Sequence, residues 1–105
     1  MSREYTEDEV RNEYLKLVWS YIDYWHDLPD QTCREKLEGL AFGMLVILDG
    51  GNPDLPGFIV APDPHPDDKE FCERQGQNWF PSNHNATVKC DIAGGLHELF
   101  HRVRK

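Results

Sequence analysis

No run of apolar residues in this sequence is long enough to cross a membrane. The longest apolar stretch, from Leu40 to Leu48, is interrupted by Gly43, whereas a spanning helix needs about 20 consecutive apolar residues. The first residues, Met-Ser-Arg-Glu-Tyr, also lack the apolar segment of a secretory signal. We therefore expect a cytoplasmic protein without a membrane partner.

Cysteine is scarce as well. Cys33, Cys72 and Cys90 are odd in number and widely spaced, and no Cys-x-x-Cys pair occurs. This pattern does not indicate a zinc ribbon, a thioredoxin-type redox site or a disulfide-rich secreted domain. We expect reduced thiols that act mostly as small core residues.

Basic residues are few. Lys and Arg number 11 against 19 Asp and Glu, and the formal net charge is −8. Non-specific DNA or RNA binding needs clustered Lys and Arg to contact phosphates, so no direct nucleic-acid partner is expected. Anionic membrane surfaces are disfavoured for the same reason. An acidic chain favours basic protein partners or cations.

The apolar content is nevertheless sufficient for a folded domain. Hydrophobic residues make up 39% of the 105 residues and aromatic residues 11%, and disordered tails lack this composition. The length suits a single domain, residues 1–105, and leaves no room for a second core.

A long helix is predicted near the N-terminus. Thr6 and Glu9 have the spacing of a capping box. Apolar residues then recur at helical spacing as far as Trp25, and Pro29 ends the pattern.

A second long helix is predicted next. Asp30 or Thr32 is its expected N-cap, and Thr32 with Glu35 forms another capping box. Its apolar stripe covers residues 33–48, and Asp-Gly-Gly at 49–51 predicts a left-handed stop. Gly39 and Gly43, four residues apart on this helix, would allow another helix to approach closely.

The second half has a different periodicity. Residues 57–61 and 86–92 are predicted strands, residues 67–74 a short helix, and residues 96 to about 103 a C-terminal helix. The predicted fold class is therefore α+β, with two long N-terminal helices, a small two- or three-stranded sheet, a short helix and a C-terminal helix. If the stripes of the two long helices face solvent in the monomer, this architecture is wrong unless the stripes form an oligomer interface. The expected core consists of Val10, Tyr14, Leu17, Val18, Ile22, Leu37, Leu40, Met44, Leu48, Ile59, Val88, Leu96 and Phe100.

The C-terminal helix contains His97-Glu98-Leu99-Phe100-His101, a literal His-Glu-x-x-His match. Histidines at i and i+4 share a helix face and can bind one zinc ion, with the glutamate as general base. A third ligand would have to come from upstream. We expect no catalytic residues and no cofactor. The alternative is a zinc-binding protein or metallohydrolase that uses His97 and His101 with His84 or His65.

Pro-His-Pro-Asp-Asp-Lys-Glu at residues 64–70 follows a predicted strand. It resembles the signature of zinc-dependent deacetylases that act on N-acetylglucosamine-type substrates. The resemblance implies His65 and Asp68 as metal ligands and Asp67 as general base. The sequence departs from this signature in two ways. Lys69 shifts the glutamate by one position to Glu70, and the motif lies after position 60 of a short chain, whereas in those enzymes it lies near the start of a larger domain. The alternative, which we favour, is a proline-stiffened turn before a helix with acids in its first turn.

Three segments together resemble small proteins of bacteriophages and bacterial mobile elements. They are Leu-Glu-Gly-Leu-Ala-Phe at 37–42, Leu-Pro-Gly-Phe at 55–58 with the motif at 64–70, and Asp-Ile-Ala-Gly-Gly-Leu-His-Glu at 91–98. The resemblance implies a bacterial or phage cytoplasmic protein that works by binding.

The leading hypothesis is a small acidic, non-enzymatic binding protein of the kind that inhibits a host or defence nucleic-acid-binding complex. Its partner is expected to be a protein with a basic surface. Aromatic side chains outside the helical stripes suit such an interface, although a small domain also needs aromatics for its core. The candidate binding residues are Glu7, Asp8, Glu9, Glu13, Asp67, Asp68, Glu70, Glu73 and Trp79.

Overall fold

The computed structural model describes residues 2–83 and 87–103. Four helices lie in these residues: α1 is Glu7–Asp27, α2 is Cys33–Leu48, α3 is Asp68–Gln75 and α4 is Leu96–Val103. None of these helices combines the length and the apolarity that a bilayer-spanning segment requires.

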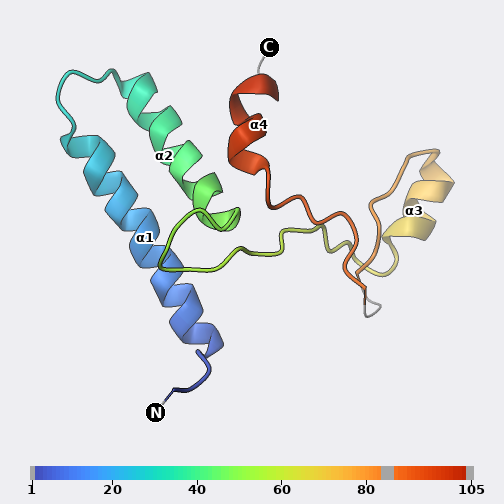
Figure 1. Ribbon diagram of the computed structural model, residues 1–105. Coiled ribbons are helices and arrows are strands. Elements are labelled where there is room, and N and C mark those ends of the chain that lie inside the picture. Colours follow the sequence, from blue (N-terminus) through green and yellow to red (C-terminus); the bar gives the residue numbers. More distant parts are fainter. Residues whose placement is uncertain (1, 84–86, 104–105) are drawn as a thin grey trace.

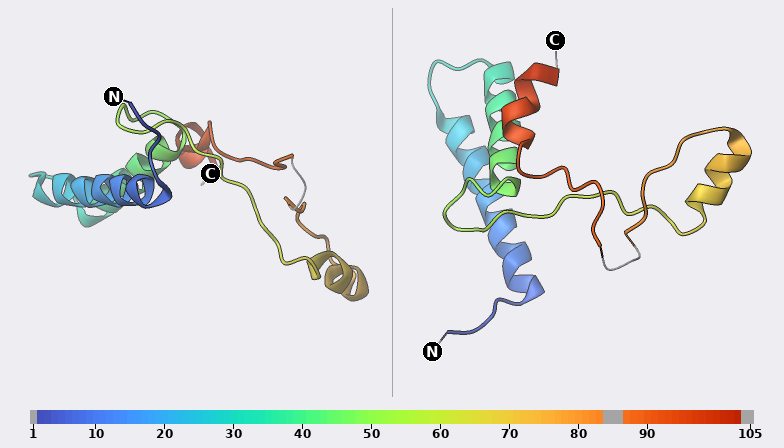
Figure 2. Two further views of the ribbon diagram at one scale, coloured as in Figure 1. Left: turned by 90° about the horizontal axis from the view of Figure 1, so that it is seen from below. Right: turned by 45° about the vertical axis from the view of Figure 1, so that its right-hand side comes forward.

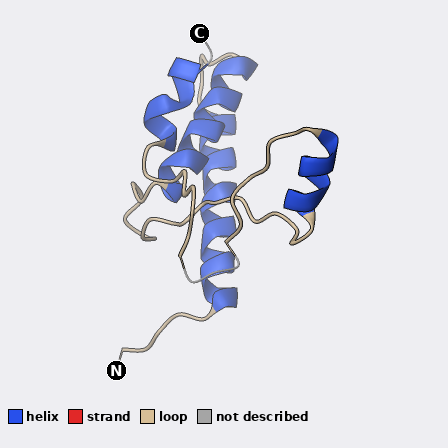
Figure 3. Ribbon diagram, turned by 90° about the vertical axis from the view of Figure 1, so that its right-hand side faces the viewer, coloured by secondary structure: helices blue, strands red, loops and turns tan. Residues whose placement is uncertain are grey.

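The prediction of an α+β fold with a small sheet is wrong, because residues 2–83 and 87–103 form helices and loops without a strand (Figure 3). The two predicted strand segments do meet, but through one backbone hydrogen bond, from the N–H of Ile92 to the carbonyl of Val60 at 2.7 Å. A sheet needs a repeating ladder of such bonds. Here the N–H of Val60 donates to the Asp91 carboxylate instead, at 2.9 Å.

Local backbone geometry also prevents a strand at residues 87–92. Cys90 has a φ of 57°, in the left-handed region that extended strands do not use. Ala86, the first residue of the predicted strand, lies outside the described residues. On the facing segment, the N–H of Phe58 donates to the carbonyl of Leu48 at the end of α2. The backbone donors are thus already used by other acceptors.

The predicted helix ends are confirmed. Thr6 with Glu9 and Thr32 with Glu35 both form complete capping boxes at the starts of α1 and α2. Beyond α2, Gly50 has a φ of 85°, which gives the left-handed stop that glycine adopts without strain.

Three helices lie side by side (Figures 1 and 2). α1 and α2 form an antiparallel hairpin, and α4 packs on the other side of α2. The two predicted glycines permit the close approach of α1, because the Trp25 ring lies over Gly39 and the Tyr21 ring over Gly43. On the other side, the Phe42 ring of α2 contacts the rings of His97 and Phe100 on α4.

Residues 63–83, which include α3, project from this layer and are called the arm (Figure 1). In the part of the chain that the structure describes, α3 packs against no other helix. The side chain of Asn83 braces the base of the arm, donating to the carbonyl of Pro62 at 2.6 Å and accepting from the N–H of Lys89 at 2.5 Å.

The predicted core is only half-buried. Ile47 of α2 is fully buried and Leu55 is 9% exposed. Neither was in the predicted core, and three predicted core residues are exposed: Leu37, Ile59 and Val88. The other ten are partly exposed. The expectation that the cysteines fill a core is wrong for Cys33 and Cys90, which are exposed.

The chain is therefore flat and open. Its extents are 53 × 49 × 19 Å and its radius of gyration is 17.7 Å, whereas a compact chain of this length has a radius of about 13 Å. A layer of three helices with an arm leaves much apolar surface without a second layer to cover it.

Candidate functional site

The carboxylate of Asp49, at the C-terminal end of α2, accepts several hydrogen bonds from a distant part of the chain. Its side chain is 1% exposed. One oxygen accepts from the N–H of Gly94 at 2.6 Å, and the other accepts from the N–H of His97 at 2.8 Å and from its ring Nδ1 at 2.5 Å. The carboxylate thus caps the N-terminus of α4 from a distant part of the chain.

These hydrogen bonds keep Asp49 ionised. Burial by itself would raise the pKa of the carboxyl group, but the backbone and imidazole of His97 and the N–H groups of Gly94 and Leu96 lower the pKa to about 2. The positive end of the α4 dipole acts in the same direction. Because an ionised carboxylate only accepts hydrogen bonds, Nδ1 of His97 must carry a proton.

An aspartate that orients a histidine is also a feature of catalytic sites, so the other neighbours of His97 decide what the pair can do. Its ring meets Phe42 edge-on, with centroids 5.7 Å apart. Among the described residues, no hydroxyl or thiol group hydrogen-bonds to the remaining ring nitrogen. Asp49 and His97 therefore form a helix cap, and the described residues around them supply no nucleophile.

The structure brings His97 and His101 together but does not complete a zinc site around them. His101 stacks on Phe42, with centroids 6.0 Å apart, so both imidazoles border the same ring. Within residues 2–83 and 87–103 no group of three His, Cys, Asp or Glu side chains could hold a metal ion. His84 lies outside the described residues. Catalytic zinc needs three protein ligands, and the described residues provide two imidazoles at this place.

His65 lies in the turn before α3, in the arm and away from α4 (Figure 1). Its Nδ1 accepts a hydrogen bond from the N–H of Asp67 at 3.2 Å, and its carbonyl accepts from the N–H of Asp68. These contacts match the proline-stiffened turn. The deacetylase-like assignment of His65, Asp67 and Asp68 thus has no metal-binding cluster in the described residues.

The predicted acidic binding residues divide into two distant groups. Those of α1 are mostly paired within their own helix start. Arg11 forms ion pairs with Glu7 at 2.7 Å and Asp8 at 2.6 Å, and Arg3 pairs with Glu9 at 2.6 Å. Glu9 also caps α1. Only Glu13 of this group has no side-chain partner among the described residues.

The acids of the arm are different. Asp68, Glu70 and Glu73 of α3 make no side-chain hydrogen bond or ion pair within the described residues. Asp67 approaches His65 at 3.8 Å. Trp79 lies in the same arm, 45% exposed, with the Lys69 ammonium 5.4 Å from its ring centroid. In the arm, acids without a side-chain partner among the described residues therefore occur together with exposed aromatics, whereas the acids at the start of α1 are mostly paired.

Asp49 was missed as a site residue, although two signals in the sequence point to it. An acid at a helix C-terminus is unfavourable with the helix dipole, which indicates that Asp49 serves another element. The helix that begins at Leu96 follows Gly94-Gly95 and has no Ser, Thr, Asp or Asn at its N-cap. A helix without its own cap needs one from elsewhere.

Comparisons with known protein families, with curated proteins and with solved structures found no match to this chain. The resemblance to proteins of phages and mobile elements stays a prediction.

Proposed function

We propose that this protein is a non-enzymatic binding protein whose arm docks on a basic surface of a protein partner. One observation carries the proposal. The arm projects from the helical layer, and it combines acids that have no side-chain partner within residues 2–83 and 87–103 with the exposed aromatic side chains of Phe71, Trp79 and Phe80.

The chemistry of the arm fits such a partner. Carboxylates that are not neutralised internally attract Lys and Arg over a distance of about 10 Å at moderate salt. Aromatic side chains bury large apolar areas and dominate the affinity of many interfaces. Acids alone would give an encounter that salt abolishes, and the aromatics add contact that salt does not weaken.

The partner class that we propose is a nucleic-acid-binding protein complex of a bacterial host or of its defence systems. Such proteins expose basic grooves, which an acidic protein can occupy as an inhibitor without itself binding nucleic acid. This role places the protein in the cytoplasm of a bacterial or phage-infected cell. The net charge of −8 and the resemblance to phage proteins support this choice.

The test is capture of partners from a bacterial lysate by the wild-type protein and by a variant with a neutral arm. The variant carries Asp68→Asn, Glu70→Gln and Glu73→Gln. A matched control carries Asp23→Asn, Asp54→Asn and Glu98→Gln, three exposed acids outside the arm. Mass spectrometry identifies and quantifies the captured proteins at low and at high salt.

The wild type and the control are expected to retain the same basic proteins, and the neutral-arm variant is expected to lose them. Raising the ionic strength should elute them from the wild type. Equal capture by the neutral-arm variant, or retention that salt does not change, would refute docking through the arm.

A further inference from the structure

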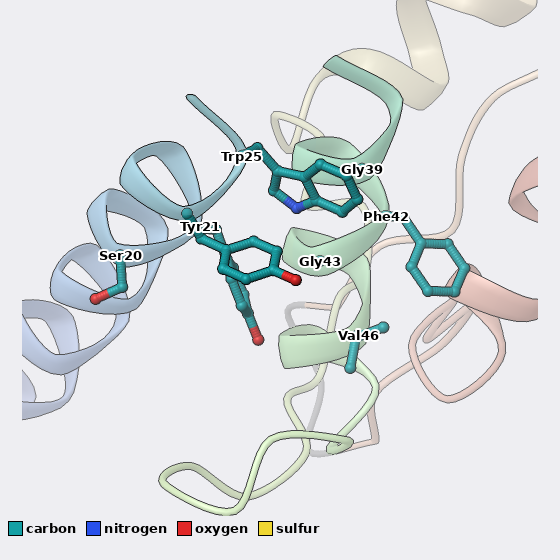
Figure 4. Close-up of a pocket in the computed structure, with 8 residues that line it drawn as sticks. Ser20, Tyr21, Trp25, Gly39, Phe42, Gly43 and Val46 are labelled. Atoms are coloured by element: carbon teal, nitrogen blue, oxygen red, sulfur yellow. The ribbon is translucent and has the colours of Figure 1, made fainter. Parts of the chain in front are cut away.

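The helical layer has an uncharged groove on one face, between α1 and α2 (Figure 4). Tyr21 and Trp25 project from α1 over the glycines of α2, and Phe42 and Val46 border the groove on the α2 side. Its volume is about 480 Å³. Tyr24 also lines it and is 58% exposed. An apolar groove of this kind, open to water, marks an interaction surface.

The absence of charge distinguishes this groove from four others on the described surface. Each of those includes at least one lysine, aspartate or glutamate, namely Lys16, Glu9 with Glu13 and Asp54, Lys69 with Lys89, and Glu38. A basic protein is attracted to carboxylates, and the groove between α1 and α2 offers it none. Its occupant must be apolar.

The exposed area of the chain shows how much contact is missing. The accessible surface is 8527 Å², whereas a compact monomer of this mass exposes about 6,100 Å². Two copies together thus expose almost 5,000 Å² in excess, and a permanent homodimer buries about 2,000–5,000 Å² in total. An interface that buried less than half of this excess area would therefore be large enough for a stable dimer.

A second copy of the chain is the occupant that this surface fits best. Among the described residues Ile47 is the only hydrophobic residue that is fully buried. The folded chain therefore needs a covering layer at all times, and not only when a regulatory partner is present. A twofold axis brings the same apolar face of two copies together, so one uncharged groove is automatically matched by another. A helical hairpin that pairs with a second hairpin gives a four-helix bundle, the usual way to bury such faces.

We propose that two copies of this chain associate through the groove between α1 and α2, so that their hairpins form a four-helix bundle. Tyr24 of each copy then lies against the groove of the other, and the arms remain outside the interface. The dimer goes beyond the proposed partner binding and does not depend on it.

The experiment is sedimentation equilibrium of the untagged full chain over a range of concentrations, together with thermal unfolding at each concentration. The wild type is expected to sediment at twice the 12.2 kDa of one chain, with a Tm that rises with concentration. A concentration-independent Tm with the mass of one chain would overturn the proposal.

Two variants locate the interface. Tyr24→Glu places a carboxylate in the groove, and Ser20→Glu places one at its edge, where Ser20 also borders the neighbouring groove. Each is expected to raise the dissociation constant of the dimer at least ~100-fold, because a symmetric interface would bury two unpaired charges. Asn12→Glu is the matched control, since Asn12 is an exposed polar residue of α1 that lines only the neighbouring groove, to which Tyr24 does not contribute.

The control should change the dissociation constant by less than about threefold, because its added charge stays in water. Far-UV circular dichroism at high concentration establishes whether each variant retains α1 and α2. Dimers of unchanged affinity for Ser20→Glu and Tyr24→Glu would refute this interface. Loss of the dimer in Asn12→Glu alone would place the contact at the neighbouring groove, which Asn12, Leu15 and Trp19 line, and would refute it as well.

Discussion

Asp49 connects α2 with α4, two helices that lie far apart in the sequence. Its buried carboxylate holds the start of α4 to the end of α2. Asp49 and His97, whose backbone N–H donates to this carboxylate, are 48 positions apart in the sequence. The literal zinc motif at residues 97–101 thus begins with a histidine whose Nδ1 and backbone N–H both donate to this aspartate. In this structure the first histidine of the motif is part of a helix cap.

Replacing Asp49 tests this role. Asp49→Ala removes the acceptor of three hydrogen bonds and leaves the N-terminus of α4 uncapped, so the free energy of unfolding should fall by about 1–2 kcal/mol. The measurement is urea unfolding at one fixed protein concentration. Asp63→Ala, an exposed acid of the arm, is the control and should change the value by less than about 0.5 kcal/mol. Equal values for both variants would contradict the capping role.

The same carboxylate makes stability depend on acid pH. Its pKa is about 2 in the folded chain against an ordinary value of 3.8, so the unfolded state binds the proton first as the pH falls. Stability from Asp49 is complete above about pH 4 and is lost as the pH drops towards 2. Glu9 acts in the same direction, because its hydrogen bonds with Arg3 and the Thr6 backbone lower its pKa from 4.5 to about 2.

Urea midpoints between pH 7 and pH 2.5 measure this effect. The wild type should lose stability below pH 4, and Asp49→Asn should lose less over the same range because its side chain does not titrate. The difference between the two proteins should therefore shrink as the pH falls. A difference that stays constant from pH 7 to pH 2.5 would show that Asp49 is not the titrating group.

At the scale of the elements, the contact between α1 and α2 depends on the lack of a side chain at Gly39. A Cβ atom there would lie 2.3 Å from the Trp25 ring. At Gly43 it would lie 3.2 Å from the Tyr21 ring, which is tight but close to contact distance. The two glycines are on the same helix and differ mainly in the room above them.

Alanine substitutions at these glycines should therefore have different effects. In a helix interior Gly→Ala ordinarily stabilises by about 0.5–1 kcal/mol. Gly39→Ala should instead destabilise by about 1–3 kcal/mol, because the Trp25 ring must move and the helices must separate. Gly43→Ala should cost clearly less. Thermal unfolding of both variants gives the order, and the reverse order would contradict this packing.

At the scale of the whole molecule, the arm and the helical layer are separable. Since α3 packs against no other helix among the described residues, the arm contributes little to the stability of the layer. Replacing residues 67–81 by a Gly/Ser linker should remove the α3 signal in circular dichroism and shift the Tm by less than about 4 °C. The same variant should lose the basic partner. A loss of cooperative unfolding would show that the arm is part of the core.

Much of this protein could be predicted from local sequence. The two capping boxes, the glycine stop after Leu48 and the helix-period stripes determined where α1 and α2 begin and end, because the groups involved lie within four residues of one another. The same holds for the turn before α3, whereas the cap of α4 comes from Asp49 in a distant part of the chain. The close approach at Gly39 and Gly43 was also visible, although the partner helix was not.

The sheet, the core and the cap of α4 depended on tertiary structure. Residues 57–61 and 87–92 have strand-like composition, but a strand requires a partner that repeats its hydrogen bonds, and here Asp91 and Leu48 accept those of Val60 and Phe58. The role of Asp49 arises only when α4 is placed against α2. Likewise, a helical stripe shows which side chains seek burial but not what covers them. Burial and distant hydrogen bonds are relations between segments, so only the folded arrangement decides them.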